Sequence, residues 1–203
     1  MNNSTHGNRG ALAIGLGVLA LTAGLALPRR ATAAEDKADH RIELAEGQIL
    51  MTAPDSWTRK QPRVRIIDHE FAVPASRGDT EDGRLTIMGA GGEVEANINR
   101  WIGQFAQADG SETKNQVPEA QRKTSVAGLD VSWVDLSGTY HDNPSPFDPN
   151  SKTVDREAYH MLAAIIVSPK LGNYFIKLYG PKQTVADHAD EFHKMIAGLT
   201  LKK

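Results

Sequence analysis

The feature that most constrains the fold is an apolar run from Tyr159 to Val167, in which nearly every side chain is hydrophobic. The run is too short and too rich in β-branched residues for a helix, so it predicts a strand. A strand that is apolar on both faces must be covered on both sides. A turn at residues 169–172 follows, and the alternating segment Asn173–Tyr179 should return antiparallel to the first strand.

The rest of the pattern supplies further strands and two helices. Strands are expected over Gln48–Thr52, Val64–Val73 and Arg84–Gly89, and two more over Gln121–Tyr140 that meet near Gly128. Apolar residues recur at helical spacing at Val94, Ile98, Trp101, Ile102 and Phe105, and again at Val185, Ala189, Phe192, Ile196 and Leu199. The second helix has a capping-box-like start, with Thr184 followed by Asp187.

These elements predict an α+β fold, in which an antiparallel sheet of about six to seven strands is flanked by helices. The sandwich should occupy residues 47–203 as a single domain, preceded by a charged linker over residues 35–46. A chain of this length buries enough apolar surface to fold without disulfides.

The first 34 residues differ from the remainder because they contain no Asp or Glu. Arg9 precedes an apolar run from Ala11 to Leu27, and Pro28 ends it. The small residues Ala31, Ala33 and Ala34 then fit a signal-peptidase site, so we expect export to the periplasm or the exterior, with cleavage after Ala33 or Ala34. The alternative is an uncleaved inner-membrane anchor formed by residues 11–27, which would be the chain's only membrane contact.

The composition excludes several classes of function. The 203 residues include no Cys, which removes thiol catalysis, cysteine-ligated metals and a lipoprotein anchor. The chain has 23 basic and 25 acidic residues, without the basic surplus that nucleic-acid binding requires. We therefore expect no nucleic-acid partner.

Two short motifs resemble those of the PsbP-like proteins. One is the turn Pro54-Asp55-Ser56-Trp57 after the first strand, and the other is Asn97-Ile98-Asn99-Arg100-Trp101 on the first helix. The second motif is similar to one branch of exported bacterial relatives of unknown function. The family includes an extrinsic protein of photosystem II and, by fold, a Ran-binding nuclear import factor. The resemblance implies an α/β/α sandwich that binds a partner and performs no chemistry. It supplies no metal or partner residues, and we propose no photosynthetic role.

The sequence contains no motif for a cofactor, a metal or a catalytic centre. Gly89-Ala90-Gly91-Gly92 fails the dinucleotide pattern because Val94 stands where a third glycine belongs. His188 and His193 are five residues apart, whereas helical zinc ligands are four apart. We expect no cofactor, metal or catalytic residues, although a serine, a histidine and an aspartate from distant segments could still assemble a hydrolytic site.

The most site-like segment is the loop from His141 to Thr153, which three prolines stiffen. Its candidate residues for a partner or ligand contact are His141, Asp142, Phe147 and Asp148. Asp142, Asp148 and Asp155 could together collect a hard cation, but their spacing matches no calcium loop.

The sequence thus predicts a non-catalytic binding or accessory protein that contacts an unidentified protein of the cell envelope. Two alternatives remain open at this stage, a carrier of a small ligand or lipid and a hydrolase with a spatially assembled site.

Overall fold

The computed structural model describes residues 40–143 and 150–202. The expected signal peptide, the alternative anchor over residues 11–27, and the cleavage-site residues Ala31, Ala33 and Ala34 lie outside the described residues. Phe147 and Asp148 also lie outside them. Within residues 40–143 and 150–202, no helix is long and apolar enough to cross a membrane.

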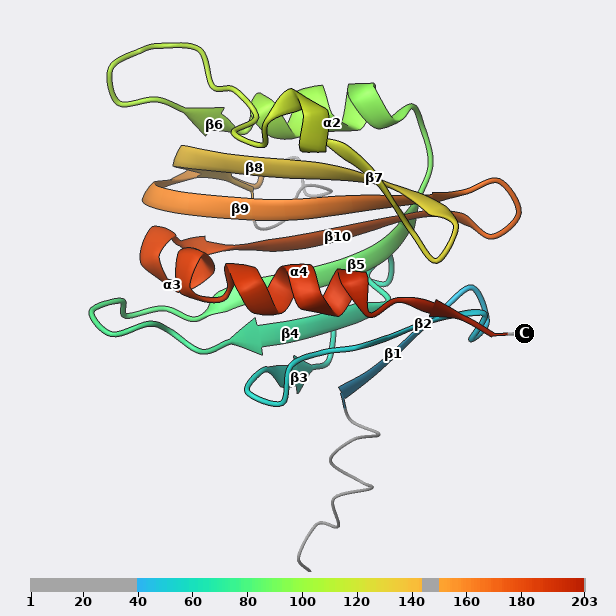
Figure 1. The fold of residues 1–203 in the computed structure, drawn as a ribbon. Helices are drawn as coiled ribbons and strands as arrows, with labels where there is room; N and C mark the ends of the chain where they lie inside the picture. The colour runs from blue at the N-terminus through green and yellow to red at the C-terminus, as the bar shows by residue number, and fades with distance from the viewer. Residues whose placement is uncertain (1–39, 144–149, 203) are drawn as a thin grey trace, which may run out of the picture. The chain divides into compact units, whose positions relative to one another are not determined.

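The described chain forms two antiparallel sheets and short helices (Figure 1). The strands are β1 (Arg41–Leu44), β2 (Ile49–Thr52), β3 (Thr58–Lys60), β4 (His69–Val73), β5 (Gly83–Ala90), β6 (Phe105–Ala106), β7 (Lys123–Val126), β8 (Leu129–Asp142), β9 (Val154–Ser168), β10 (Gly172–Pro181) and β11 (Thr200–Leu201). The helices are α2 (Val94–Ile102), α3 (Lys182–Asp187) and α4 (Ala189–Ala197), with a 3₁₀ turn, η1, at Glu119–Gln121.

The main sheet has eight strands in the order β3-β4-β5-β10-β9-β8-β6, with β7 paired to β8. The predicted central strand is confirmed, because β9 lies between β10 and β8 and is buried on both faces. Leu162, Ala164 and Ile166 pack on one face, while Met161, Ala163 and Ile165 pack on the other.

Helices cover both faces, so the predicted α+β sandwich is confirmed. The face under α4, here the α4 face, buries Trp57, Phe71 and Phe192, and the small sheet β1-β2-β11 helps to cover it. The opposite α2 face buries Ile98 and Trp101 of the helix. The main sheet has eight strands, one more than the upper limit of the expected six to seven. The short strands β3 and β6 are not expected from the sequence, since they are only three and two residues long. Such short strands leave almost no periodic signal.

The expected linker over residues 35–46 is wrong for its last part, where β1 forms. Ile42 and Leu44 are fully buried and alternate with exposed Arg41 and Glu43. This alternation spans only four residues, and pairing with β2 rather than local pattern stabilises the strand.

Two predicted elements have different ends. The strand expected over Val64–Val73 begins only at His69, because residues 64–67 form a turn closed by the Ile67 N–H on the Val64 carbonyl at 3.1 Å. The first helix ends at Ile102, and Phe105 belongs to β6.

The C-terminal helix does not begin at a Thr184 capping box. It begins after Pro181 and breaks at His188 into α3 and α4. Thr184 is fully buried and donates its hydroxyl to Asp79 Oδ2 at 2.6 Å, while its backbone N–H donates to the same oxygen at 2.9 Å. The capping carboxylate therefore comes from the β4–β5 loop and not from Asp187, which a local sequence pattern cannot reveal.

A candidate binding surface on the α2 face

The predicted loop begins where β8 ends, and the first two candidate residues have partners on β9. His141 Nδ1 lies 2.7 Å from Asp155 Oδ1, and Asp142 Oδ2 lies 3.5 Å from Arg156 Nε. Each of these carboxylates already faces a basic group, which opposes the alternative of a cation site here. Residues 40–143 and 150–202 contain no group of three or more side chains able to hold a metal.

Three tyrosines stand beside this end of the hairpin. Tyr140 is buried, stacks on Tyr159 with ring centroids 6.1 Å apart, and contacts Tyr179 at 5.7 Å. Tyr159 donates its hydroxyl to Glu81 Oε2 at 2.8 Å. Burial raises the pKa of Tyr140 above its ordinary range and that of Tyr159 to about 12. All three phenols therefore stay neutral at physiological pH and present apolar rings with polar tips.

Arg84 on β5 is fixed beside Tyr179. It donates Nε and Nη2 to the two Glu70 carboxylate oxygens at 2.9 Å each, and Nη1 to the Tyr179 hydroxyl. Burial alone would lower the pKa of Arg84, but its bonds and charge interactions with Glu70 and Tyr179 outweigh burial and raise it. Arg84 is thus a permanent, neutralised cation.

Lys177 on β10 is different because it makes no ion pair within residues 40–143 and 150–202. Its strand neighbours are the small residues Thr86 and Ala163. Its Nζ lies 5.3 Å from the ring centroid of Trp101 and 5.5 Å from that of Tyr179. No Asp or Glu of the described chain approaches this Nζ within ion-pair distance. An ammonium between two aromatic faces is stabilised by their π-electrons, though less than by a carboxylate.

The surroundings depress the pKa of Lys177 to about 8. Burial is the main cause, the positive charges of Arg100 and Arg84 add to it, and Asp142 acts in the opposite direction. We refer to Lys177, Arg84, Tyr140, Tyr159 and Tyr179, with Trp101 above them, as the cation–tyrosine surface. Tyr140 and Trp101 are buried, whereas Tyr159, Tyr179 and Lys177 are partly exposed. Because Lys177 has no ion-pair partner among the described residues, the surface can attract an anionic group.

Helix α2 positions the upper wall of this surface. Asn97 is buried and donates Nδ2 to the carbonyls of Glu93 at 2.9 Å and Gly91 at 3.3 Å, and its Oδ1 accepts from Arg100 at 2.7 Å. Trp101 packs edge-on against Phe175 at 5.3 Å. Asn97, Arg100 and Trp101 of the helical motif therefore meet at this surface.

The tryptophan of the other motif lies on the α4 face. Trp57 is 1% exposed, and its Nε1 lies 3.4 Å from His188 Nδ1. Its position makes it a core residue.

A histidine and a carboxylate do pair on the α4 face, as a hydrolase would require. His160 Nε2 lies 2.9 Å from Asp135 Oδ1, and Ser137 stands opposite His160 in the strand register. The Ser137 hydroxyl, however, accepts from Gln116 Nε2 at 2.6 Å. His160 Nδ1 is buried and has no hydrogen-bond partner in the part of the chain that the structure describes. The serine and the histidine are therefore not linked as a nucleophile and its base would be.

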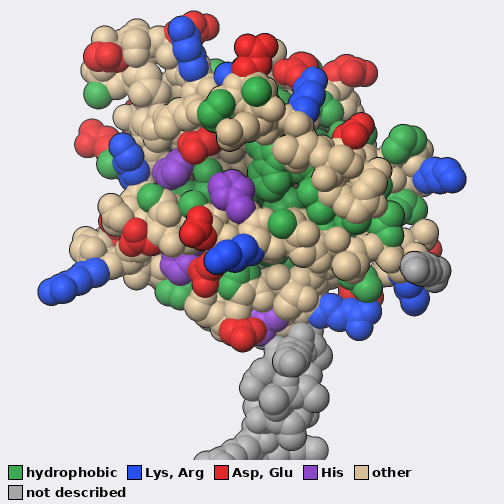
Figure 2. All heavy atoms as spheres, viewed as in Figure 1, with side chains coloured by type: hydrophobic (Ala, Val, Ile, Leu, Met, Phe, Trp, Pro, Cys, Tyr) green, Lys and Arg blue, Asp and Glu red, His purple; other side chains and the backbone are tan. Residues whose placement is uncertain are grey.

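Other histidines on the α4 side serve the packing of α3 and α4. Figure 2 shows histidine side chains gathered on this side of the molecule, beside a hydrophobic area. His188 lies 2.6 Å from Glu191 Oε2 and 3.1 Å from the Pro74 carbonyl, and His193 packs on Trp133 at 5.2 Å.

His69, at the rim, bridges Arg59 and the Glu43 carbonyl.

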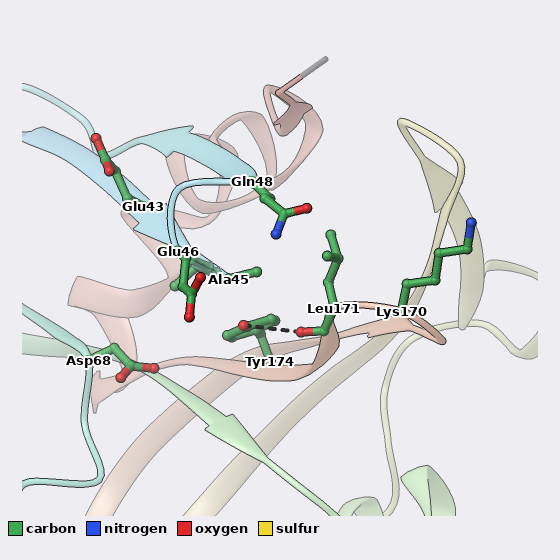
Figure 3. A pocket seen from close by; sticks show the side chains of 9 residues that line it. Glu43, Ala45, Glu46, Gln48, Asp68, Lys170, Leu171 and Tyr174 are labelled. Carbon is green, nitrogen blue, oxygen red and sulfur yellow. Dashed lines mark hydrogen bonds between the residues drawn. The ribbon is translucent and has the colours of Figure 1, made fainter.

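Two open pockets bear on the carrier alternative. The larger, of about 710 Å³, lies between α2 and the segment 112–123 and has a mixed lining that includes Ile98, Glu112 and Arg122. The other, of about 560 Å³, lies between the β1–β2 turn and the β9–β10 turn (Figure 3).

Some polar groups of the pocket in Figure 3 are already engaged. Asp68 accepts from the Gly89 N–H at 2.9 Å, and Tyr174 donates to the Leu171 carbonyl at 3.2 Å. Glu46 and Tyr174 face the same opening, while Lys170 stands apart at the far side. Both pockets are therefore surface hollows rather than the enclosed apolar cavity of a carrier.

Sequence reasoning identified His141 and Asp142 but missed the residues beside them. Lys177 was visible as the one charged residue on an otherwise aromatic strand face, between Phe175 and Tyr179. A lone lysine in such a position is a usable signal. Arg84 could not be found from the sequence, because residues 84 and 179 become neighbours only through the β5–β10 pairing.

No family model and no curated protein matches this chain. Solved structures similar in fold include PsbP (CyanoP) from Synechocystis sp. PCC 6803, with 11% identity, 80% of this chain and 91% of that chain covered, and a TM-score of 0.49. They also include LpqN of Mycobacterium tuberculosis, involved in cell envelope biogenesis, with 11% identity, 85% and 98% coverage, and a TM-score of 0.48. The family that the sequence resembles is thus represented among them, and the likeness concerns the fold alone.

Proposed function

We propose that this chain is an exported accessory protein that acts by binding a protein of the cell envelope through the cation–tyrosine surface. The observation that carries the proposal is the placement of the partly exposed Tyr159 and Tyr179 beside Lys177, at the end of the sheet where His141 and Asp142 lie. Among the described residues, Lys177 has no ion-pair partner. Tyrosine and arginine are enriched where proteins bind each other, because they combine large contact area with polar tips.

The export half of the proposal rests on the leader. An apolar run, Pro28 and the small residues at 31–34 occur in the order that a signal peptidase recognises. Sequencing the N-terminus of the protein recovered outside the cytoplasm tests it. A start at Ala34 or Glu35 supports the proposal, whereas an intact Met1 on membrane-bound protein would replace it with the anchor.

The binding half can be tested by site-specific photo-crosslinking in the intact envelope. A crosslinking amino acid replaces Arg100, which is exposed on α2 beside the surface, and in a matched variant it replaces Asp190, exposed on α4. We expect a discrete crosslinked protein from position 100 and none from position 190. Equal crosslinking from both positions, or none from position 100, would contradict a partner at this surface.

A further inference from the structure

We propose that Lys177 is the anchor of an anion site, and that its ligand is a carboxylate side chain on an acidic segment of the partner protein. This inference rests on the proposed function and names the chemistry that the surface recognises. It starts from an imbalance of charge on the α2 face.

The imbalance arises because the nearby carboxylates are already used. Both carboxylate oxygens of Glu70 accept hydrogen bonds from Arg84, and Asp142 lies against Arg156. Arg100 bonds only to the neutral amide of Asn97. Lys177 keeps its charge without an acidic partner among the described residues, in surroundings that exclude much of the water. An incoming anion would therefore gain more there than at a solvated lysine.

The number of charges favours a monovalent ligand. Four cations lie at or beside the surface, namely Arg84, Lys177, Arg100 and Arg156. Three carboxylates accompany them, namely Glu70, Asp142 and Glu81. One further carboxylate balances this set, whereas a doubly charged phosphate would also be repelled by Glu70 and Asp142. The rings of Trp101 and Tyr179 around Nζ suit the apolar stem of a glutamate side chain, and so favour a protein segment over a small free anion.

The site should respond to pH through Lys177 itself. Its pKa of about 8 places the loss of the ammonium charge just above physiological pH, so carboxylate binding should weaken as pH rises through 8. The charged or titratable groups that face Lys177 or its neighbours on the surface come from every surrounding element: Glu70 of β4, Arg84 of β5, Arg100 of α2, Tyr140 and Asp142 of β8, Tyr159 of β9 and Tyr179 of β10. The three phenols have raised pKa values, so they do not titrate in this range.

The test is a titration of the full mature chain with a synthetic hexaglutamate peptide, followed by the NMR shift of the Lys177 ε-carbon and by the affinity. The variant Lys177→Met keeps the length and removes the charge, and Lys194→Met on the exposed side of α4 is its matched control. We expect at least a tenfold loss of affinity in Lys177→Met, no change in Lys194→Met, and a smaller loss in Arg100→Gln. We also expect weaker binding at pH 9 than at pH 7.

Two further probes identify the source of the anion. Inorganic phosphate that displaces the peptide and binds more tightly would assign the site to free phosphate and overturn the proposal. If the protein binds vesicles of anionic phospholipid only when Lys177 is present, and does not bind the peptide, the site recognises a membrane and the proposal is overturned. Equal peptide affinity in Lys177→Met and the wild type would also refute it. A crosslink from position 100 that survives in Lys177→Met would leave the partner surface standing while rejecting the anion site.

Discussion

The two faces of the main sheet are built differently. On the α4 face, large rings such as Trp57, Phe71 and Phe192 are fully buried under α4 and the small sheet. On the α2 face, a single nine-residue helix covers part of the sheet, and Tyr159, Tyr179 and Lys177 remain partly exposed. The first face holds the fold together, and the second leaves rings and charge available for contact. The same central strands thus support stability on one side and binding on the other.

The largest expected effect tests the α4 face. Replacing Phe192 with Ala should lower the free energy of unfolding by about 3–5 kcal/mol, because the fully buried ring leaves a cavity that the packed helix and sheet cannot fill. The matched change on the other face, Trp101→Ala, removes a ring that is also buried, but a single nine-residue helix covers it and can move to close the gap, so the loss should be smaller. Chemical denaturation of both variants measures this, and a greater loss in Trp101→Ala would reverse the comparison.

The next expected effect is an increase in the free energy of unfolding. Replacing Lys177 with Met should raise the free energy of unfolding at pH 7 by up to about 3 kcal/mol, because the folded protein no longer confines an uncompensated ammonium. The increase should appear in denaturant melts without a change in their slope. A destabilised Lys177→Met would mean that the lysine is bound within the fold and not held for a ligand.

This gain should depend on pH. Above pH 8 the folded wild type releases the Lys177 proton, while the unfolded chain retains it up to about its ordinary pKa of 10.5. The unfolded state then binds more protons, so wild-type stability rises with pH and the gap to Lys177→Met narrows. The comparison should stop near pH 10. There the tyrosines of the unfolded chain ionise before those of the folded protein, so the free energy of unfolding falls. Melts from pH 7 to pH 10 follow the gap, and a constant gap would contradict the lowered pKa.

A smaller loss is expected at the start of α3. Asp79→Ala removes the carboxylate that accepts two hydrogen bonds from Thr184 and should cost about 1–2 kcal/mol. Asp79→Asn retains one acceptor oxygen and should recover part of the loss. If both variants melt like the wild type, the cap does not support the α4 face.

The smallest effect belongs to the margin of the binding surface. His141→Ala removes an exposed pair with Asp155 and should change the free energy of unfolding by no more than about 0.5 kcal/mol. The same variant is expected to alter crosslinking from position 100. A stability loss above 2 kcal/mol would place His141 among the groups that hold the hairpin together.

The sequence predicted the features that depend on local pattern and missed those that depend on pairing. The apolar run around Ile165 foretold a central strand, and the stripe through Phe192 foretold a helix on the sheet. Asp79 capping Thr184 and Arg84 bonding Tyr179 join residues about a hundred positions apart, so no window of sequence contains them. His141 and Asp142 could be selected from a proline-rich loop, but their neighbours Lys177 and Arg84 required the strand register.

The cap on Thr184 also bears on how the chain acquires its structure. Residues 182–197 are synthesised about a hundred residues after Asp79, and their two short helices would be barely helical as a free peptide. Asp79, which satisfies their first turn, has by then long left the ribosome. Helices α3 and α4 can therefore form directly against the Asp79 carboxylate. On heating, α3, α4 and the β4–β5 loop should unfold together in one cooperative transition.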